Sequence, residues 1–429
     1  MPNRKLPPPI HDIDRIQLPA IDTAQLDNGI PVYLISMGSQ DVLKLEIIFH
    51  AGRPYEHQRL VGRATSRLLR EGSAQYSSAE IAERVDFYGA TLNIPINLDT
   101  SSIVLYTLSK HLEALLPLVA DMLTQPLFPE EELENYVHRC IQSLQVELSK
   151  NEVVAYRTIT ELIFGEDHPY GYNSLPDTYA ALRREDLVRH FENRYHSGNC
   201  QLLLSGGLRA NSLDLLNRHL GQTIPRGVRT PAQISTRDTR PEQLWIDRPG
   251  TVQTAIRIGG RFHSKQHPDY HAFYILNTVL GGYFGSRLMT NIREDKGYTY
   301  NIFSTVDSFH HAGCFYIGTE VGNEFTRATI EEIYREIDRL RETLVPPEEM
   351  KMLRNYLLGS WLSTIDGAFN VASIVRTLVV EDLSFDDFDR SVARIRQISA
   401  EELRELARQY LRREDLWEVI VGESAPSGN

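Results

Sequence analysis

The sequence predicts an α+β protein built from two similar domains, each a mainly antiparallel sheet covered by helices. The clearest sign is an internal repeat. Residues 184–208 and 400–424 both run as an amphipathic helix with a Tyr near its end, a polar turn, an apolar strand and a glycine. The two copies lie about half the chain length apart, which indicates duplication of a whole domain. A length of 429 residues also exceeds that of one typical domain.

Strand signals are strong in the first half. Asn28-Gly29 is a favoured two-residue turn flanked by alternating apolar residues, so we expect a β-hairpin there. The runs 42–52 and 91–108 are rich in β-branched residues, and 199–207 supplies the strand that follows the repeated helix. This pattern favours one sheet in the first half of the chain.

Helix signals lie between these strands. Residues 59–73 carry apolar side chains at helical spacing and end on Gly72-Ser73, so we expect a buried helix there. Ser77 or Ser78 is expected to cap a second amphipathic helix. Further helices are expected near 111–125, 129–150 and 184–195.

A segment rich in Pro, Thr, Arg and Gly separates the two halves and is typical of a linker. We therefore expect an N-terminal domain at 1–218, a linker at 219–240 and a C-terminal domain at 241–429.

Composition excludes several functions. The net charge is −12 and no run of Lys or Arg stands out, so nucleic acid is not an expected partner. Cys140, Cys200 and Cys314 are scattered without metal or redox spacing, which favours free thiols in a reducing compartment. No apolar leader or membrane-spanning stretch is visible, so we expect no membrane association and a cytoplasmic location, or a periplasmic one if a signal was removed.

The order of motifs in the first half, with the loop 49–62, the helix 59–73 and the capped helix in 77–93, resembles the pitrilysin-type zinc peptidases, family M16, in their short bacterial branch. The resemblance implies two domains of the LuxS/MPP-like metallohydrolase type that close like a clam shell around an extended peptide. It is strongest to non-catalytic members such as the alpha subunit of the mitochondrial processing peptidase.

In that family the first long helix carries His-x-x-Glu-His, which binds zinc and supplies a general base. With Gly72-Ser73 as the fixed end, the resemblance places the two His positions at Arg63 and Arg67 and the Glu position at Ser66. The third ligand position falls at 142–143, where Gln and Ser stand. Arginine cannot lose its proton to become a ligand, so we expect this chain to hold no metal and to have no intact catalytic site.

The second half retains a different feature of the family. The stretch 280–304 resembles the Gly-rich loop and helix that contribute an Arg and a Tyr to peptide binding, here Arg293 and Tyr300, with Gly281 and Gly282 in the loop. From residue types alone, Arg293 could equally form a surface ion pair with Glu294 or Asp295, Tyr300 could be a half-buried strand residue, and the glycines could form an ordinary turn.

Three functions are compatible with this pattern. The first is a non-catalytic subunit that supplies peptide-binding residues to an M16 chain with an intact zinc motif, the zinc being in that partner, or that self-associates. The second is a catalytically silent structural protein of the same fold. The third is an active zinc peptidase with an unrecognised metal site.

Overall fold

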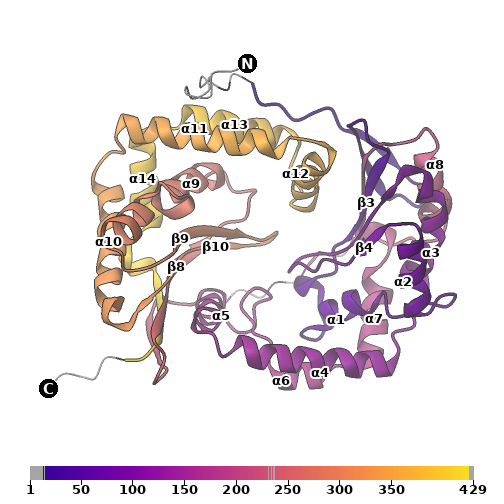
Figure 1. Cartoon of the computed structure of the whole chain (residues 1–429), viewed down its shortest axis with the longest axis horizontal. Helices are drawn as coiled ribbons and strands as arrows, with labels where there is room; N and C mark the ends of the chain where they lie inside the picture. Colours follow the sequence, from indigo (N-terminus) through magenta and orange to yellow (C-terminus); the bar gives the residue numbers. More distant parts are fainter. Residues whose placement is uncertain (1–12, 14, 230, 233, 235–236, 425–429) are drawn as a thin grey trace, which may run out of the picture.

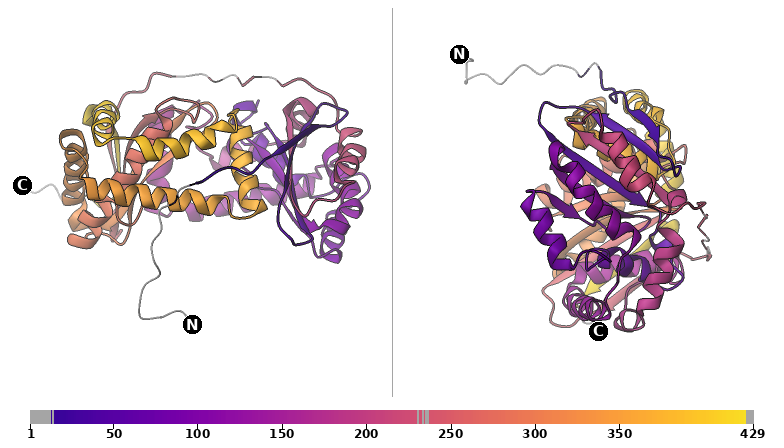
Figure 2. Two further views of the ribbon diagram at one scale, coloured as in Figure 1. Left: turned by 90° about the horizontal axis from the view of Figure 1, so that it is seen from above. Right: turned by 90° about the vertical axis from the view of Figure 1, so that its right-hand side faces the viewer.

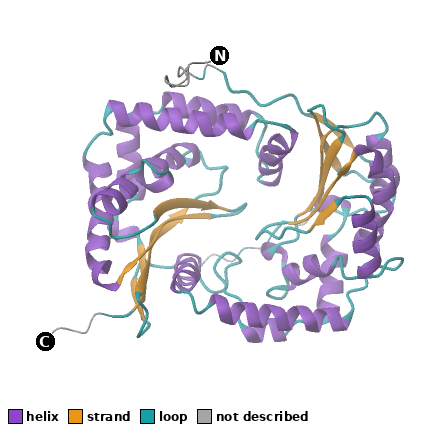
Figure 3. Cartoon of the chain, viewed as in Figure 1, coloured by secondary structure: helices purple, strands orange, loops and turns teal. Residues whose placement is uncertain are grey.

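The structure is a computed structural model that describes residues 13, 15–229, 231–232, 234 and 237–424. Two sheets face each other across the middle of the molecule, with most helices on their outer sides (Figures 1 and 3). Among the described residues no helix is long and apolar enough to cross a bilayer.

The first sheet has six strands in the order β1-β2-β6-β3-β5-β4. Its strands are β1 (Asp22–Gln25), β2 (Pro31–Ser36), β3 (Val42–Phe49), β4 (Thr91–Asn93), β5 (Ser101–Leu108) and β6 (Cys200–Gly206). The hairpin expected at Asn28-Gly29 joins β1 to β2 in antiparallel register, and only the pair β2–β6 is parallel.

The second sheet has five strands in the order β7-β11-β8-β10-β9. Its strands are β7 (Gln243–Asp247), β8 (Gln253–Phe262), β9 (Ile302–Ser308), β10 (Gly313–Gly322) and β11 (Trp417–Gly422). The order matches β2-β6-β3-β5-β4 strand for strand, and the pair β7–β11 is again the parallel one. The structure therefore confirms the α+β class and the duplication.

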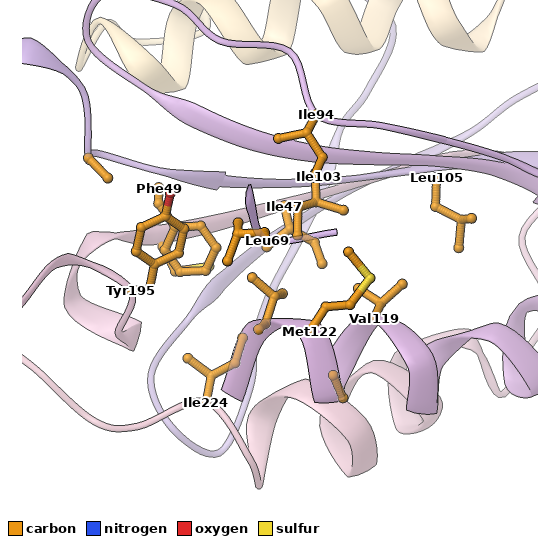
Figure 4. Packing of buried hydrophobic residues seen from close by; sticks show 14 of the residues in the cluster. Ile47, Phe49, Leu69, Ile94, Ile103, Leu105, Val119, Met122, Tyr195 and Ile224 are labelled. Carbon is orange, nitrogen blue, oxygen red and sulfur yellow. The ribbon is translucent and has the colours of Figure 1, made fainter. Parts of the chain in front are cut away.

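Helices of the first half mostly cover the outer face of the first sheet. They are α1 (Val61–Leu68), α2 (Ser78–Phe87), α3 (Leu112–Thr124), α4 (Glu130–Glu147), α5 (Asn151–Phe164), α6 (Pro176–Ala180), α7 (Arg184–Arg194) and α8 (Ser212–Leu216). Figure 4 shows how this core is filled, with Ile47, Ile103 and Leu105 of the sheet lying over Val119 and Met122 of α3.

Helices of the second half cover the second sheet in the same way. They are α9 (Tyr270–Asn277), the π-helical turns η5 (Thr278–Gly282) and η6 (Met289–Asp295), α10 (Thr326–Glu342), α11 (Pro347–Thr364), α12 (Ala368–Val380), α13 (Asp386–Gln397) and α14 (Ala400–Tyr410). The repeated helix and strand of the sequence are α7 with β6 and α14 with β11, and the equivalent residues Leu187 and Leu403 are both fully buried.

Two helices are exchanged between the halves. Helix α12 of the second half packs on the inner face of the first sheet, against Ile35, Ile48 and Leu203. Helix α5 of the first half packs on β8, β10 and β11 of the second sheet, where Ile159 and Val419 share one apolar cluster. Figure 1 and the left view of Figure 2 show the halves side by side along the long axis, and Figure 1 shows α12 and α5 between the sheets. The predicted linker boundaries at 219–240 stay a prediction.

The helix expected at 59–73 is shorter than the sequence pattern suggested. Helix α1 ends at Leu68, and the backbone amide of Leu69 already bonds to the carbonyl of Ser66 in a tighter turn. Gly72 lies beyond this turn at a φ of 131°, a conformation that favours glycine. The second helix is capped by Ser77, whose hydroxyl accepts from the amide of Glu80 in a capping box.

Candidate functional site

Helix α1 presents the three positions that would carry zinc chemistry. It packs against α7, α4 and β5, and this packing buries Ser66 while leaving Arg63 and Arg67 exposed. Within the described part of the chain neither arginine forms an ion pair or hydrogen bond. The helix therefore carries two fixed positive charges on its outer side.

Ser66 belongs to a buried hydroxyl network. Its oxygen lies 2.6 Å from the hydroxyl of Ser101, which also accepts a hydrogen bond of 2.9 Å from Tyr195. Burial raises the pKa of Tyr195 to about 12, so its phenol stays protonated and donates. These hydroxyls satisfy one another, and position 66 offers a hydroxyl where a general base would need a carboxylate.

A cavity of about 520 Å³ opens beside α1 and is walled by both halves of the molecule. From the first half it reaches Arg63, Ser66 and the segment 96–101, and from the second half Lys265 and Arg376. Arg67 does not line it. Arg63 and Ser66 thus line a cavity whose walls come from both halves of the molecule.

Glu56 forms part of the wall and is held by its own loop. It accepts hydrogen bonds from the amides of Leu60 (3.1 Å) and Gly62 (2.9 Å) and from the Tyr172 hydroxyl (2.7 Å). Burial raises the pKa of Glu56, while these donors and nearby Arg53 work in the opposite direction. Its carboxylate is fully engaged in shaping the entrance to α1.

Charged pairs close the cavity on the side of α12. Arg376 of α12 donates to Glu46 of β3 at 2.7 Å and to Thr100 at 3.0 Å, which ties the two halves together. Lys265 lies 3.2 Å from Glu381, at the end of the same helix. These contacts join residues that are far apart in the sequence.

A histidine-rich seam lies next to the cavity. His50, at the end of β3, is 1% exposed, and its ring lies 5.8 Å from that of His310 in the β9–β10 turn. His310 is 3.4 Å from Asp382, which pairs with Arg229. Burial lowers the pKa of His50 to about 3, and the charge of Arg229 adds to this. We infer that this seam is built around a neutral His50.

The second half brings Arg293 and Tyr300 together. The Arg293 guanidinium lies 4.9 Å from the Tyr300 ring centre and 5.0 Å from that of Phe284, so both rings are within cation–π distance of it. Tyr300 is 86% exposed. Neither the ion pair with Glu294 or Asp295 nor a half-buried tyrosine is what the structure shows, and the pair lies outside the cavity that Arg63 lines.

The two loop glycines differ in their surroundings. A side chain at buried Gly281 would come within 2.5 Å of the Ser304 amide, so glycine lets η5 approach β9 closely. Gly282 is exposed, and its nearest contact would be 3.3 Å. Tyr298, the other tyrosine of this segment, stacks on Phe325 at 4.8 Å.

Across the described residues no group of three or more His, Cys, Asp or Glu side chains is arranged to hold a metal ion. The third-ligand position on α4 carries Gln142 and Ser143, both exposed, and Gln142 contacts His138. The residues present near α1 therefore do not fit a zinc ion.

Sequence reasoning did not find Glu56, His50, Arg376 or Lys265. Arg376 is a charged residue inside an apolar helix pattern, whereas His50, Glu56 and Lys265 lie in loops or directly after a strand, where the sequence gives no local signal. Such residues become interpretable only when the opposite half of the chain is in place.

A duplicated sheet-and-helix unit around a shared chamber defines a two-domain chambered fold. Comparison with known proteins agrees. Residues 32–165 match the family model "Insulinase (Peptidase family M16)", and residues 181–357 match "Peptidase M16 inactive domain". The chain belongs to peptidase family M16.

Individual relatives are distant but span most of the chain. An "uncharacterized zinc protease YmxG" of Bacillus subtilis is 21% identical and covers 94% of this chain and 97% of its own length. A "non-peptidase homolog YmxG" of Helicobacter pylori is 23% identical over 74% of each chain. A solved structure from Pseudomonas fluorescens, a "peptidase M16 inactive domain", superposes with a TM-score of 0.87 at 20% identity and covers 95% of this chain and all of its own.

Proposed function

We propose that this chain is a non-catalytic M16 homologue that supplies peptide-binding residues and chamber walls to a partner M16 chain with an intact zinc motif. The observation that most directly supports this proposal is a contrast between two segments of the chain. Helix α1 presents Arg63, Ser66 and Arg67 where zinc chemistry needs two imidazoles and a carboxylate. The second half keeps Arg293 in contact with Tyr300, with the arginine half-buried and the tyrosine exposed.

Arg293 and Tyr300 are suited to hold a peptide backbone. Cation–π contacts with two rings hold the Arg293 guanidinium, and its N–H groups are free to donate because no hydrogen bond occupies them within the described residues. The Tyr300 phenol is a second exposed donor. Two such donors can bind a peptide carbonyl and, opposite a metal site in a partner, the oxyanion that forms there.

The experiment is reconstitution with the partner. Purification of the tagged chain from its host, followed by mass spectrometry, should recover an M16 chain with intact His-x-x-Glu-His. In the reconstituted complex, Arg293→Ala and Tyr300→Phe should reduce peptidase activity by about 10²-fold, the usual cost of losing a preorganised oxyanion donor. Tyr298→Phe, in the same segment but stacked on Phe325, is the matched control and should leave activity unchanged.

Two results would contradict the proposal. Full activity of both variants in an intact complex would favour a silent structural protein of the same fold. Stoichiometric zinc in the isolated chain, lost when α1 is mutated, would favour an active peptidase with a metal site of its own.

A further inference from the structure

We propose that the cavity beside α1 binds a carboxylate group of a peptide, with Arg63 as its counter-ion. The position that would hold a zinc ligand thus serves as an anion site. The identity of the ligand as a peptide rests on the proposed function, whereas the sign of its charge follows from the cavity itself.

Two of the four basic side chains that line the cavity already form ion pairs with carboxylates of the protein. Lys265 is paired with Glu381 at 3.2 Å, and Arg376 with Glu46 at 2.7 Å. Both pairs sit at the seam between the halves, where they hold α12 in place. Neither cation is free to bind an additional anion without breaking a structural contact.

The remaining cations are Arg53 and Arg63. Arg53 donates to the carbonyls of Pro169 and Tyr172 and stacks on the Tyr172 ring at 4.1 Å, so its orientation is fixed by the loop. Its charge faces the buried carboxyl of Glu56. Among the described residues neither Arg53 nor Arg63 has a carboxylate within ion-pair distance, but only Arg63 of the four cavity cations has no hydrogen-bond partner as well.

The carboxylates of the wall are not available to Arg63. Glu56 is held by two amides and a phenol. Asp99 accepts from Tyr170 and, at 3.1 Å, from the backbone amide of His310. Glu381 is engaged by Lys265. The electrostatic neighbours of Arg63 are instead the phenols of three tyrosines and the thiol of Cys140, none of which is a carboxylate.

Size and geometry favour the end or a short side chain of a peptide. A volume of about 520 Å³ is in the range of cavities that enclose a small ligand. A guanidinium offers two parallel donors to a carboxylate, a stronger arrangement than a bond to a neutral carbonyl. A terminal carboxylate and an Asp or Glu side chain share this chemistry.

The test is equilibrium binding to the isolated full-length chain by calorimetry at low salt. The probes are acetyl-hexa-alanine as the free acid, the same peptide as the amide, and an amide carrying one central Glu. We expect the free acid or the Glu peptide to bind at least tenfold more tightly than the neutral amide. Whichever anionic peptide binds identifies the source of the carboxylate.

Variants locate the site. Arg63→Gln should remove the preference for the anionic peptide, while Arg67→Gln, one helical turn further and outside the cavity, should keep it. Equal binding of acid and amide, no binding of any anionic peptide, or an equal loss in both variants would overturn the proposal. Because no partner or peptidase activity enters this measurement, its failure is distinct from failure of the complementation model.

Discussion

Five strands of each half are arranged in the same order, but the halves differ in the segment that follows the equivalent strands β3 and β8. In the first half, α1 follows β3 and presents Arg63 to the cavity. In the second half, α9, η5 and η6 follow β8 and present Arg293 between two aromatic rings. The comparison teaches that the duplicated fold fixes where a functional helix stands, while a few side chains decide its chemistry.

The two sheets also differ in how they contact the helix that the opposite half contributes. Under α12 the first sheet combines apolar residues with the charged pair Lys44–Glu46, and Arg376 joins that pair from α12. Under α5 the second sheet offers apolar side chains such as Trp417 and Val419, with the Tyr156–Asp307 hydrogen bond of 2.8 Å beside them. The contact under α12 therefore includes an ion pair between the halves, and removing that charge should weaken it.

The largest expected effect tests the equivalence of the repeats. Leu187→Ala and Leu403→Ala each remove a fully buried side chain at matching positions of α7 and α14. Each should lower the free energy of unfolding by about 2–5 kcal/mol, measured by chemical denaturation. A loss confined to one variant would show that the halves do not unfold as equal units.

Acid should weaken the first half. His50 has an ordinary pKa of 6.5 when unfolded and about 3 when buried. Its neutral form therefore supports folding fully above pH 6.5, and this support is lost as the pH falls from 6.5 toward 3. The loss should be about 2 kcal/mol at pH 5.

Denaturation at pH 7 and pH 5 measures this effect, with His50→Leu as the variant that should show a flatter pH profile. His138→Leu, at an exposed position on α4, is the matched control and should retain the wild-type profile. If the stability of His50→Leu fell with pH as steeply as that of the wild type, His50 would not be the source of the acid sensitivity.

Charge removal at the seam gives a smaller effect. Arg376→Met should lower the free energy of unfolding by about 1–3 kcal/mol because Glu46 loses one partner while Lys44, at 2.7 Å, remains. Arg209→Met breaks an exposed pair with Asp41 and should cost about 0–1 kcal/mol. An equal loss of unfolding free energy in the two variants would mean that the Arg376–Glu46 ion pair stabilises the protein no more than an exposed pair does.

The smallest effect is expected from cutting the linker. Trypsin should cleave first near Arg237, whose side chain is 68% exposed. Because α5 and α12 are exchanged, the two fragments should still elute together in size-exclusion chromatography. Early cleavage within 280–300 would contradict the linker at 219–240. Separate elution of the fragments would show that the packing of α5 and α12 on the opposite sheets does not hold the halves together.

The sequence by itself determined the α+β class, the duplication and the residue types of α1, which include Arg63, Ser66 and Arg67. The strands follow from alternating apolar residues and the helices from 3.6-residue spacing, and the duplication follows from a repeat that pairs Leu187 with Leu403. The chemistry of Arg63, Ser66 and Arg67 likewise needs no tertiary contact, because an arginine is charged wherever it lies.

Only the tertiary structure decided what those residues meet. Local sequence offered Glu294 or Asp295 as partners for Arg293, but Phe284 and Tyr300 enclose it. The exchange of α5 and α12 and the pairing of Arg376 with Glu46 join segments that are hundreds of residues apart or belong to opposite halves. Periodicity reports which face of an element is apolar but not which distant element covers it, so the cavity exists only once both sheets are assembled.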